Sequence, residues 1–405
     1  LRSSASHLQQ PGASVSSNIN TPRLDLDSLY GGGPHISPLL YDLSRSNYFK
    51  IDRRTICIKG NEISFNDLPR KLYDPISPND NFAPALIADP RNDENIVLAQ
   101  LHVAFLSLHN YLVKKYRLNK AADFREAQRL TSWHYQWIIL YDYLPRIVGK
   151  SLLRNILGPL HKDAPGHANA CSHSNRKYFT GHQTWLPVEF FAAAFRMGHS
   201  MVRSSYNFNE YGTPAGSRED SIFHNPPNRI PQNFVDWRLF FFRKKSKVRK
   251  ANFSKKINCL IDEEMITRLP GVVAPPNIVF KNLEFGIKMQ LPSGQSVAAH
   301  LQQQVLTSKE FSTARPSEYK NLKDAFPLSN PKTSFKQFCD NSPLWFYILM
   351  EASIKAKGNR LGSVGARIVA EVIIGLIEAD PNSFLAVAPS WTPELSQNGH
   401  FTMMD

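Results

Sequence analysis

Arg91 and Glu94 are the residues whose types and spacing point most directly to chemistry. They stand three positions apart in ADPRNDENIVLAQLHVAFLSLHN, residues 88–110. Apolar residues follow at the spacing of an amphipathic helix, and they are Val97, Leu101, Phe105, Leu108 and Leu112. Helical spacing puts Arg91 and Glu94 on one face of the first turn of that helix. On such a face Arg91 could supply a fixed positive charge to a reaction. The alternative interpretation is that Arg91 forms a surface salt bridge.

His199 stands out in a second segment, VEFFAAAFRMGHSMVR, residues 188–203. A lone histidine on an apolar helix is normally a core residue with its hydrogen bonds satisfied, and the alternative is a metal ligand. Gly198 lies beside it, and a glycine adds no side chain that would push a flat group away from the helix.

Several segments, in the same order, resemble the animal haem peroxidase superfamily, the myeloperoxidase and peroxinectin-like group, and most closely its bacterial branch. Residues 88–110 are similar to the distal arginine helix, and residues 188–203 to the proximal helix. NLEFGIKMQLPSGQSVAAHL, which begins at Asn282, is similar to a recurrent bacterial pattern. The resemblance runs from about residue 20 to residue 392, interrupted by a basic tract.

The resemblance implies a haem b site and a role for each matching residue. His199 would be the axial ligand of the haem iron, with Asn282 as the hydrogen-bond partner of its second ring nitrogen. Arg91 would be catalytic, stabilising negative charge on the leaving peroxide oxygen. Glu94 matches a position that is ester-linked to a haem methyl in some members. Phe285 stands where the family usually has an arginine near a haem propionate.

The resemblance also implies calcium, in NTPRLDLDSLYGGGP, residues 20–34. Thr21, Asp25, Asp27 and the carbonyl of Arg23 match the family's calcium loop, and alternating oxygen ligands suit a hard cation. Taken alone, the two aspartates would more simply form an Asx-rich turn.

Two features bear on whether the chain turns over peroxide. The family's distal histidine lies in a short segment upstream of the calcium loop, and neither His7 nor His35 lies in that context. Either the chain begins downstream of that segment or this homologue has lost the residue, whose loss typically costs about 10² to 10⁴ in rate. Arg196 stands where fatty-acid oxygenases of the superfamily carry a radical-forming tyrosine, which favours a peroxidase.

Composition allows a large core and gives no sign of a membrane span. The chain has 405 residues, of which 42% are apolar and 11% aromatic. The longest apolar run, Val369 to Ile377, is too short to cross a bilayer. The first twenty residues lack a signal-peptide pattern, although animal relatives are often secreted or at the cell surface. Four widely spaced cysteines at 57, 171, 259 and 339 are expected to be free thiols.

The net charge of +14 is concentrated in a basic tract, residues 243–256. Phenylalanines flank this tract, so it could bind a polyanion or an anionic surface, and the simpler interpretation is a solvated loop. Four histidines in a Gly/Asn/Ser-rich region favour a surface loop over a metal cluster, and they are His161, His167, His173 and His182.

The pattern predicts a mainly α fold, a single large helical domain of the animal haem peroxidase type with haem between a distal and a proximal helix. The predicted helices span residues 92–116, 124–148, 188–202, 343–354 and 363–379. Residues 1–80 are expected to be loop-rich, with a strand-like piece at Thr55 to Ile58. We assign residues 1–19 to a flexible strip, 20–395 to the domain, 243–256 to a loop insertion and 396–405 to a tail.

Two functions from different classes remain. The first is a haem peroxidase, an oxidoreductase that reduces hydrogen peroxide through a ferryl intermediate, oxidises a small halide or phenol-like donor and could serve the response to oxidative stress. The alternative is a haem-binding or haem-free scaffold with weak or no turnover, because the distal histidine segment is absent from this chain.

Overall fold

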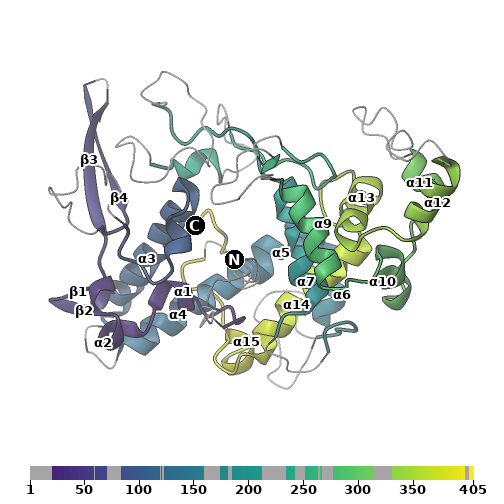
Figure 1. Ribbon diagram of the computed structural model, residues 1–405. Helices are drawn as coiled ribbons and strands as arrows, with labels where there is room; N and C mark the ends of the chain where they lie inside the picture. The colour runs from purple at the N-terminus through teal and green to yellow at the C-terminus, as the bar shows by residue number, and fades with distance from the viewer. Residues whose placement is uncertain are drawn as a thin grey trace. The chain divides into compact units, whose positions relative to one another are not determined.

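The computed structural model describes residues 21–58, 60–70, 84–118, 120, 123–158, 174–180, 185–211, 234–241, 251–262, 265–266, 277–313, 331–396 and 401–405. Helices dominate these residues, and each of the two described sheets has two strands, which confirms the mainly α prediction (Figure 1). The chain forms two compact units. Unit 1 comprises residues 1–23, 137–202 and 254–402, and unit 2 comprises residues 24–136, 203–253 and 403–405.

Unit 2 is organised around helix α3 (Ile96–Tyr116). An aromatic cluster packs against it from α1 (Asp27–Tyr30), β1 (Tyr41–Asp42), β2 (Arg45–Phe49) and α4 (Phe124–Ile138). The rings of Tyr41 and Phe49 stack with their centroids 4.7 Å apart. Two short elements, α2 (Gly33–Ile36) and η2 (Pro38–Leu40), connect α1 to β1. The loop-rich N-terminal region is therefore pinned to α3 largely by aromatic packing.

The predicted apolar stripe on α3 was wrong in phase. Helix α3 begins at Ile96, because the side chain of Asn95 caps it by accepting from the amide of Leu98 at 3.0 Å. The buried face carries Ile96, Ala99, Gln100, His102, Val103, Leu106, His109, Leu112 and Val113. Of the predicted stripe only Leu112 is buried, since polar side chains share the inner face. Within the described residues α3 alone has the length and hydropathy of a membrane span, and more than half of that window is buried in the protein.

Unit 2 also contains a long antiparallel hairpin. Strands β3 (Asp52–Ile58) and β4 (Asn61–Asp67) pair from Asp52 opposite Asp67 to Ile58 opposite Asn61 (Figure 1). The sequence predicted a strand only at Thr55 to Ile58. The second strand was missed because its polar, alternating residues resemble loop sequence.

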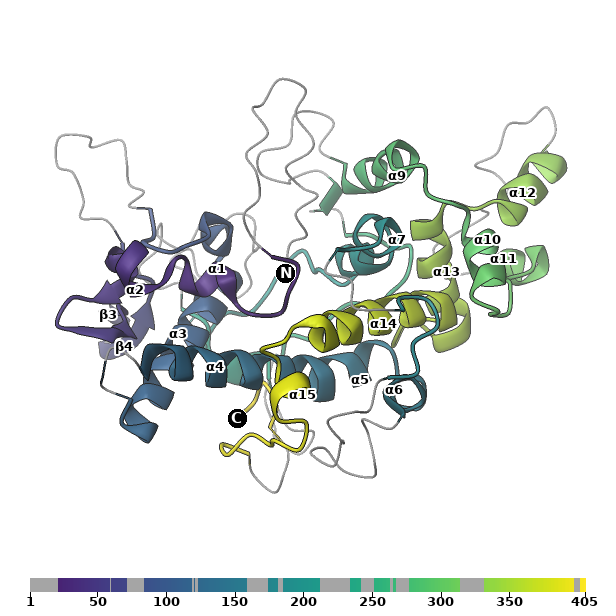
Figure 2. The ribbon, with the colours of Figure 1, turned by 90° about the horizontal axis from the view of Figure 1, so that it is seen from below.

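Unit 1 is built around α14 (Ser363–Ala379), which has the predicted bounds and is almost wholly buried. It packs against α13 (Leu344–Ala356) and α6 (Lys150–Leu157), as Figure 2 shows. The carboxylate of buried Glu351 in α13 accepts from the amides of Val364 and Gly365, which fixes the N-terminus of α14. Further helices of unit 1 are α9 (Ile278–Lys288), α10 (Gly294–His300), α11 (Ser308–Thr313), α12 (Pro331–Asp340) and α15 (Phe384–Val387).

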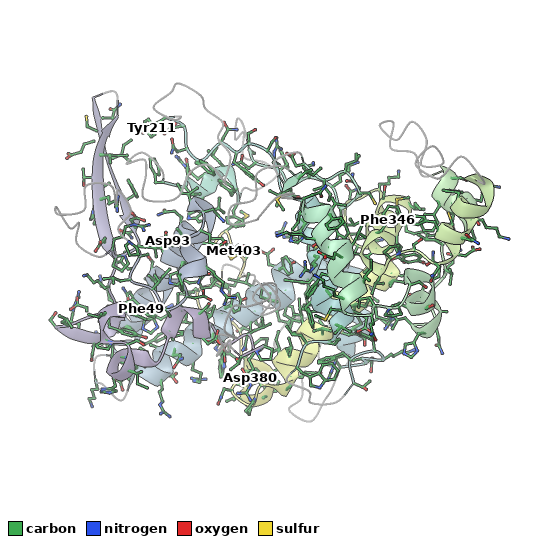
Figure 3. All side chains as sticks on the ribbon, in the orientation of Figure 1. Phe49, Asp93, Tyr211, Phe346, Asp380 and Met403 are labelled. Carbon is green, nitrogen blue, oxygen red and sulfur yellow. The ribbon has the colours of Figure 1, made fainter. Side chains whose placement is uncertain are left out.

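Aromatic contacts join the outer helices of unit 1 to α13. Phe346, labelled in Figure 3, lies with its ring centroid 5.1 Å from that of Phe338 in α12 and 6.4 Å from that of Phe311 in α11. Helices α6 and α9 to α12 were not predicted, since they are short and interrupted by polar residues.

Two predicted helices are subdivided. Residues 124–148 form α4, a π-helical turn at Ile139–Tyr143 and α5 (Leu144–Ile147). The wide turn precedes Pro145, which has no amide hydrogen to donate back along the helix. Residues 188–202 form α7 (Val188–Ala192) and the 3-10 helix η7 (Ala194–Ser200), because Ala193 leaves the helical region with φ −134° and ψ −70°.

The three described cysteines, Cys57, Cys259 and Cys339, are free thiols, in agreement with the sequence prediction. Cys171 lies outside the described residues. The division of the chain at residues 19, 20, 395 and 396 stays a prediction.

Candidate functional site

His199 and Asn282, which lie 83 positions apart in the sequence, meet in unit 1. The amide nitrogen Nδ2 of Asn282 lies 2.9 Å from His199 Nδ1. His199 is half-buried in η7, and Asn282 is buried in α9 with 1% of its surface exposed. Helix α9 is fixed by its N-cap, because the side chain of Asn277 accepts from the amides of Val279 and Phe280.

Arg196 holds the other side of the same amide. Its Nη1 donates to Asn282 Oδ1 at 2.7 Å, and its Nε donates to the carbonyl of Phe191 at 3.0 Å. The guanidinium lies 4.5 Å from the ring centroid of Phe285, which is buried. Desolvation lowers the pKa of Arg196 from its ordinary value. The residue that departs from the family pattern, Phe285, therefore supports an arginine whose structural role the sequence did not reveal.

This arrangement fixes the direction of the hydrogen bond to His199. Since Oδ1 of Asn282 accepts from Arg196, its Nδ2 faces His199 and donates to Nδ1. A neutral imidazole that accepts at Nδ1 carries its proton on Nε2. The proton of His199 is thus set by Arg196 through Asn282.

The surface beside His199 has room for a flat group. Apart from its chain neighbours and the backbone of its own helix, a Cβ atom placed on Gly198 would have no atom of the described residues within 4 Å. Met197, on the other side of Gly198, is buried. The indole Nε1 of Trp345 donates to the carbonyl of Arg196 at 3.3 Å, which ties η7 to the start of α13. The residues present therefore fit a planar group such as haem.

Arg91 and Glu94 lie in unit 2, and the predicted position of both was wrong. They belong to the 3-10 helix η3 (Pro90–Asp93) and its C-cap, not to the first turn of α3. The carboxylate of Asp89 caps η3 and binds Arg91 through Nε at 2.9 Å and Nη2 at 2.6 Å. That hydrogen bond raises the pKa of Arg91, with smaller contributions from Glu94 and Asp27.

One atom of Arg91 has no hydrogen bond in the described structure. Its Nη1 is buried and has no partner there, while the whole side chain is 17% exposed. Glu94 is exposed. A buried guanidinium N–H without an acceptor is costly, so it suggests a ligand that is not part of the chain.

An ion pair between buried Arg70 and half-buried Asp93 fixes η3 to the rest of unit 2. Asp93, labelled in Figure 3, accepts two hydrogen bonds from Arg70, at 2.7 and 2.9 Å. Arg54 binds Asp67 at 2.7 Å on the hairpin, beside Arg70. This network could not be predicted from the sequence, because its members come from separate elements.

His102 is a functional candidate that the sequence interpretation missed. It is buried on α3, and its Nδ1 lies 3.0 Å from Nδ2 of Asn92, which is next to Arg91. Burial lowers the pKa of His102 to about 4. Its spacing of seven residues from buried His109 was the available signal, because it places both on one helix face.

The proposed calcium residues make turn-like contacts. Asp25 Oδ1 accepts from the amide of Asp27 at 3.2 Å, and Asp27 Oδ1 accepts from the amide of Ser28 at 2.7 Å. Thr21 is exposed and Arg23 is half-buried. No group of three or more His, Cys, Asp or Glu side chains suited to a metal occurs in the described part of the chain.

Most of the other candidate residues lie outside the part of the chain that the structure describes. His161, His167, His173, His182 and most of the tract 243–256 lie outside the described residues. At the end of that tract, Lys255 Nζ forms an ion pair with Asp262 at 3.3 Å.

Comparison with known proteins decides the family. Residues 1–266 match the family model described as animal haem peroxidase. This chain belongs to the animal haem peroxidase family. Members of the family bind haem, and the peroxidase class assigned from the sequence is confirmed at that level.

Several curated peroxidases are similar to this family member over part of its length. Human lactoperoxidase is 27% identical over 254 residues, which are 58% of this chain and 32% of the relative. Dog thyroid peroxidase is 26% identical over 233 residues, which are 54% of this chain and 22% of the relative. Heme peroxidase 2 of Caenorhabditis elegans is 27% identical over 182 residues, which are 41% of this chain and 24% of the relative. The chain thus spans about a quarter to a third of these relatives.

The fold is also shared with a solved structure. Peroxidase A from Dictyostelium discoideum superposes with a TM-score of 0.60 at 18% identity, covering 89% of this chain and 64% of that one. This confirms the predicted fold beyond residue 266, where the sequence match to the family model ends.

Proposed function

We propose that this chain is a haem-dependent peroxidase that reduces hydrogen peroxide and oxidises a small donor. The observation that carries the proposal is the hydrogen-bonded series Arg196, Asn282 and His199. With Nδ1 engaged by Asn282, Nε2 of His199 is the nitrogen that would hold the iron. When bound, haem b supplies the redox-active iron at which peroxide is cleaved.

The chain's own groups would control a proton and a charge in that reaction. To hold the iron through the lone pair of Nε2, His199 would carry its ring proton on Nδ1 instead, and the side-chain amide of Asn282, 2.9 Å away, would accept it through its oxygen. Arg91 would stabilise negative charge on the leaving oxygen through its buried Nη1, while Asp89 keeps the guanidinium in place. Glu94, exposed at the end of η3, is the residue proposed for a covalent link to haem.

Calcium binding by Thr21, Arg23, Asp25 and Asp27 is a separate proposal. It is supported by the resemblance and by the density of oxygen atoms in the loop, although the two carboxylates already form local turns. Metal analysis of the purified chain and of Asp27→Asn tests it. Equal calcium content in both would oppose it.

Haem titration of the full chain and of His199→Ala tests the proposed ligand. A Soret spectrum typical of histidine-ligated iron in the parent and its loss in the variant support the proposal. The rival is a haem-binding or haem-free scaffold with weak or no turnover, and it is favoured because exposed His35 does not stand in the sequence context of the family's distal histidine. The haem-free form of this rival requires that the parent chain bind haem no better than His199→Ala.

A further inference from the structure

A cavity of about 170 Å³ opens on unit 1 between α9, the turn that follows α9 and the start of α13. It is lined by residues of three short segments, which are Asn282, Leu283, Gly286 and Ile287, then Leu291, Pro292 and Ser293, then Asn341, Ser342, Pro343, Leu344 and Trp345. We call it the α9–α13 pocket. Nothing in the family resemblance assigns it a ligand.

The chemistry of the α9–α13 pocket selects a small neutral molecule. None of its lining side chains is charged, so it offers nothing to offset the desolvation of an anion. Its volume is comparable with that of a roughly 150 Å³ cavity that holds one benzene molecule. Leu283, Leu344 and Trp345 supply apolar surface, and the exposed amide of Asn341 can pair with a hydroxyl. A single aromatic ring with one hydroxyl matches these features.

Two lining residues connect the pocket directly to the segment that carries His199. Asn282 forms part of the wall, and its amide lies 2.9 Å from His199 Nδ1. Trp345, 4% exposed, donates its indole N–H to the carbonyl of Arg196, three residues before His199. One lining residue therefore forms a hydrogen bond to the imidazole of His199, and another is a tryptophan, which can be oxidised.

We propose that the α9–α13 pocket binds a neutral single-ring phenol, and that Trp345 relays its electron toward His199. The electron relay rests on the proposed peroxidase function, whereas phenol binding does not. Each phenol gives one electron and one proton and leaves as a phenoxyl radical. Two phenols reduce one hydrogen peroxide to two waters, so the atoms and electrons balance. Trp345 loses an electron to the oxidised centre and regains one from the phenol, and it is unchanged overall.

Binding is tested on the full chain, with and without added haem, by ¹⁹F NMR titration with 4-fluorophenol. Gly286→Leu fills the pocket, and α9 tolerates a side chain there because a Cβ would lie 3.5 Å from Leu291 Cδ1, an ordinary contact. Lys288→Leu adds the same side chain to the same helix outside the pocket. We expect Gly286→Leu to weaken binding by at least about tenfold and Lys288→Leu to leave it unchanged. Equal affinities in the parent and Gly286→Leu would overturn the pocket.

The relay is tested by Trp345→Phe, which keeps an aromatic ring in the wall. Freeze-quenched samples of the haem-loaded chain with peroxide should give the electron paramagnetic resonance signal of a tryptophanyl radical, absent from Trp345→Phe. Oxidation of 4-fluorophenol should slow in the variant although 4-fluorophenol still binds. An unchanged radical signal and oxidation rate would overturn the relay. A parent chain that ignores peroxide would overturn the relay together with the proposed function, and the binding result would stand.

Discussion

Arg196 and Asn282 together decide which nitrogen of His199 carries a proton. The guanidinium donates to Oδ1 of the amide at 2.7 Å, so the amide nitrogen must face the imidazole, 2.9 Å from Nδ1. The guanidinium of Arg196 also packs against the ring of Phe285. The geometry of Arg196, Asn282 and His199 therefore depends on an apolar residue.

Asn282→Leu should weaken haem binding by about 10- to 100-fold, the usual effect of removing the hydrogen-bond partner of a metal-bound histidine. The leucine has a similar size but cannot form a hydrogen bond with His199. Haem titration followed by the Soret band measures the change. Asn359→Leu is the matched control, since Asn359 is exposed in the same unit. Equal losses in both variants would refute a specific role for Asn282.

Arg91→Gln should slow the reaction with peroxide by about 10² to 10³, because a preorganised donor to the developing charge is removed. Haem affinity should change little. Stopped-flow mixing of the haem-loaded chain with peroxide measures the rate.

Arg238→Gln is a closely matched control for that experiment. Arg238 lies in the 3-10 helix η8 (Trp237–Leu239), two residues after a capping aspartate, and binds Asp236 through Nε at 2.9 Å and Nη2 at 2.7 Å. This repeats the geometry of Asp89 and Arg91, but the Arg238 side chain is 78% exposed against 17% for Arg91. If both substitutions slowed the reaction alike, the buried position of Arg91 would not matter.

Arg70→Met should lower the free energy of unfolding by up to roughly 3 to 5 kcal/mol, since it leaves the half-buried carboxylate of Asp93 without its cation. Arg45→Met, at an exposed pair with Asp42, should lower the free energy of unfolding far less, because water screens the pair. Urea denaturation of both variants provides the comparison. A loss at Arg70 no larger than at Arg45 would contradict the proposed support of η3.

Stability should fall as the pH drops from about 6.5 to about 4. Burial lowers the pKa of both His102 and His109 from 6.5 to about 4, so the unfolded chain takes up protons first. The contribution of the two neutral histidines to the free energy of unfolding is complete above pH 6.5. It decreases between pH 6.5 and about 4 and is lost below about pH 4. Each histidine accounts for at most roughly 3 kcal/mol.

His109→Gln isolates one part of this effect. The Tyr30 hydroxyl lies 3.0 Å from His109 Nδ1, and His109 Nε2 lies 2.9 Å from the carbonyl of Asn47. A glutamine cannot be protonated, so urea unfolding of the variant should depend less steeply on pH between 6.5 and 4. Replacing exposed His35 by glutamine should leave the slope of the parent. A parent slope retained in His109→Gln would show that His109 does not titrate as described.

The sequence predicted the elements whose signal is local and missed those set by distant contacts. The bounds of α14 follow from one continuous apolar run. The break at Ala193 and the shifted start of α3 could not be read from periodicity, because they depend on neighbouring elements and on the cap at Asn95.

The candidate site shows the same division. His199 and Asn282 were proposed from the resemblance, and the structure brings them into contact. The role of Arg196 was not predicted, because it requires Phe285 and Asn282, which lie more than eighty positions away, to surround one guanidinium. His102 was missed because an apolar helix face was expected to exclude it.

Peroxidase activity is tested most directly by the absorption spectrum of the haem-loaded full chain after rapid mixing with one equivalent of hydrogen peroxide. We expect rapid loss of the Soret band and its recovery when a phenolic donor is added, with neither change in His199→Ala. A Soret band in the parent chain that does not respond to peroxide would contradict peroxidase activity and leave a haem-binding scaffold.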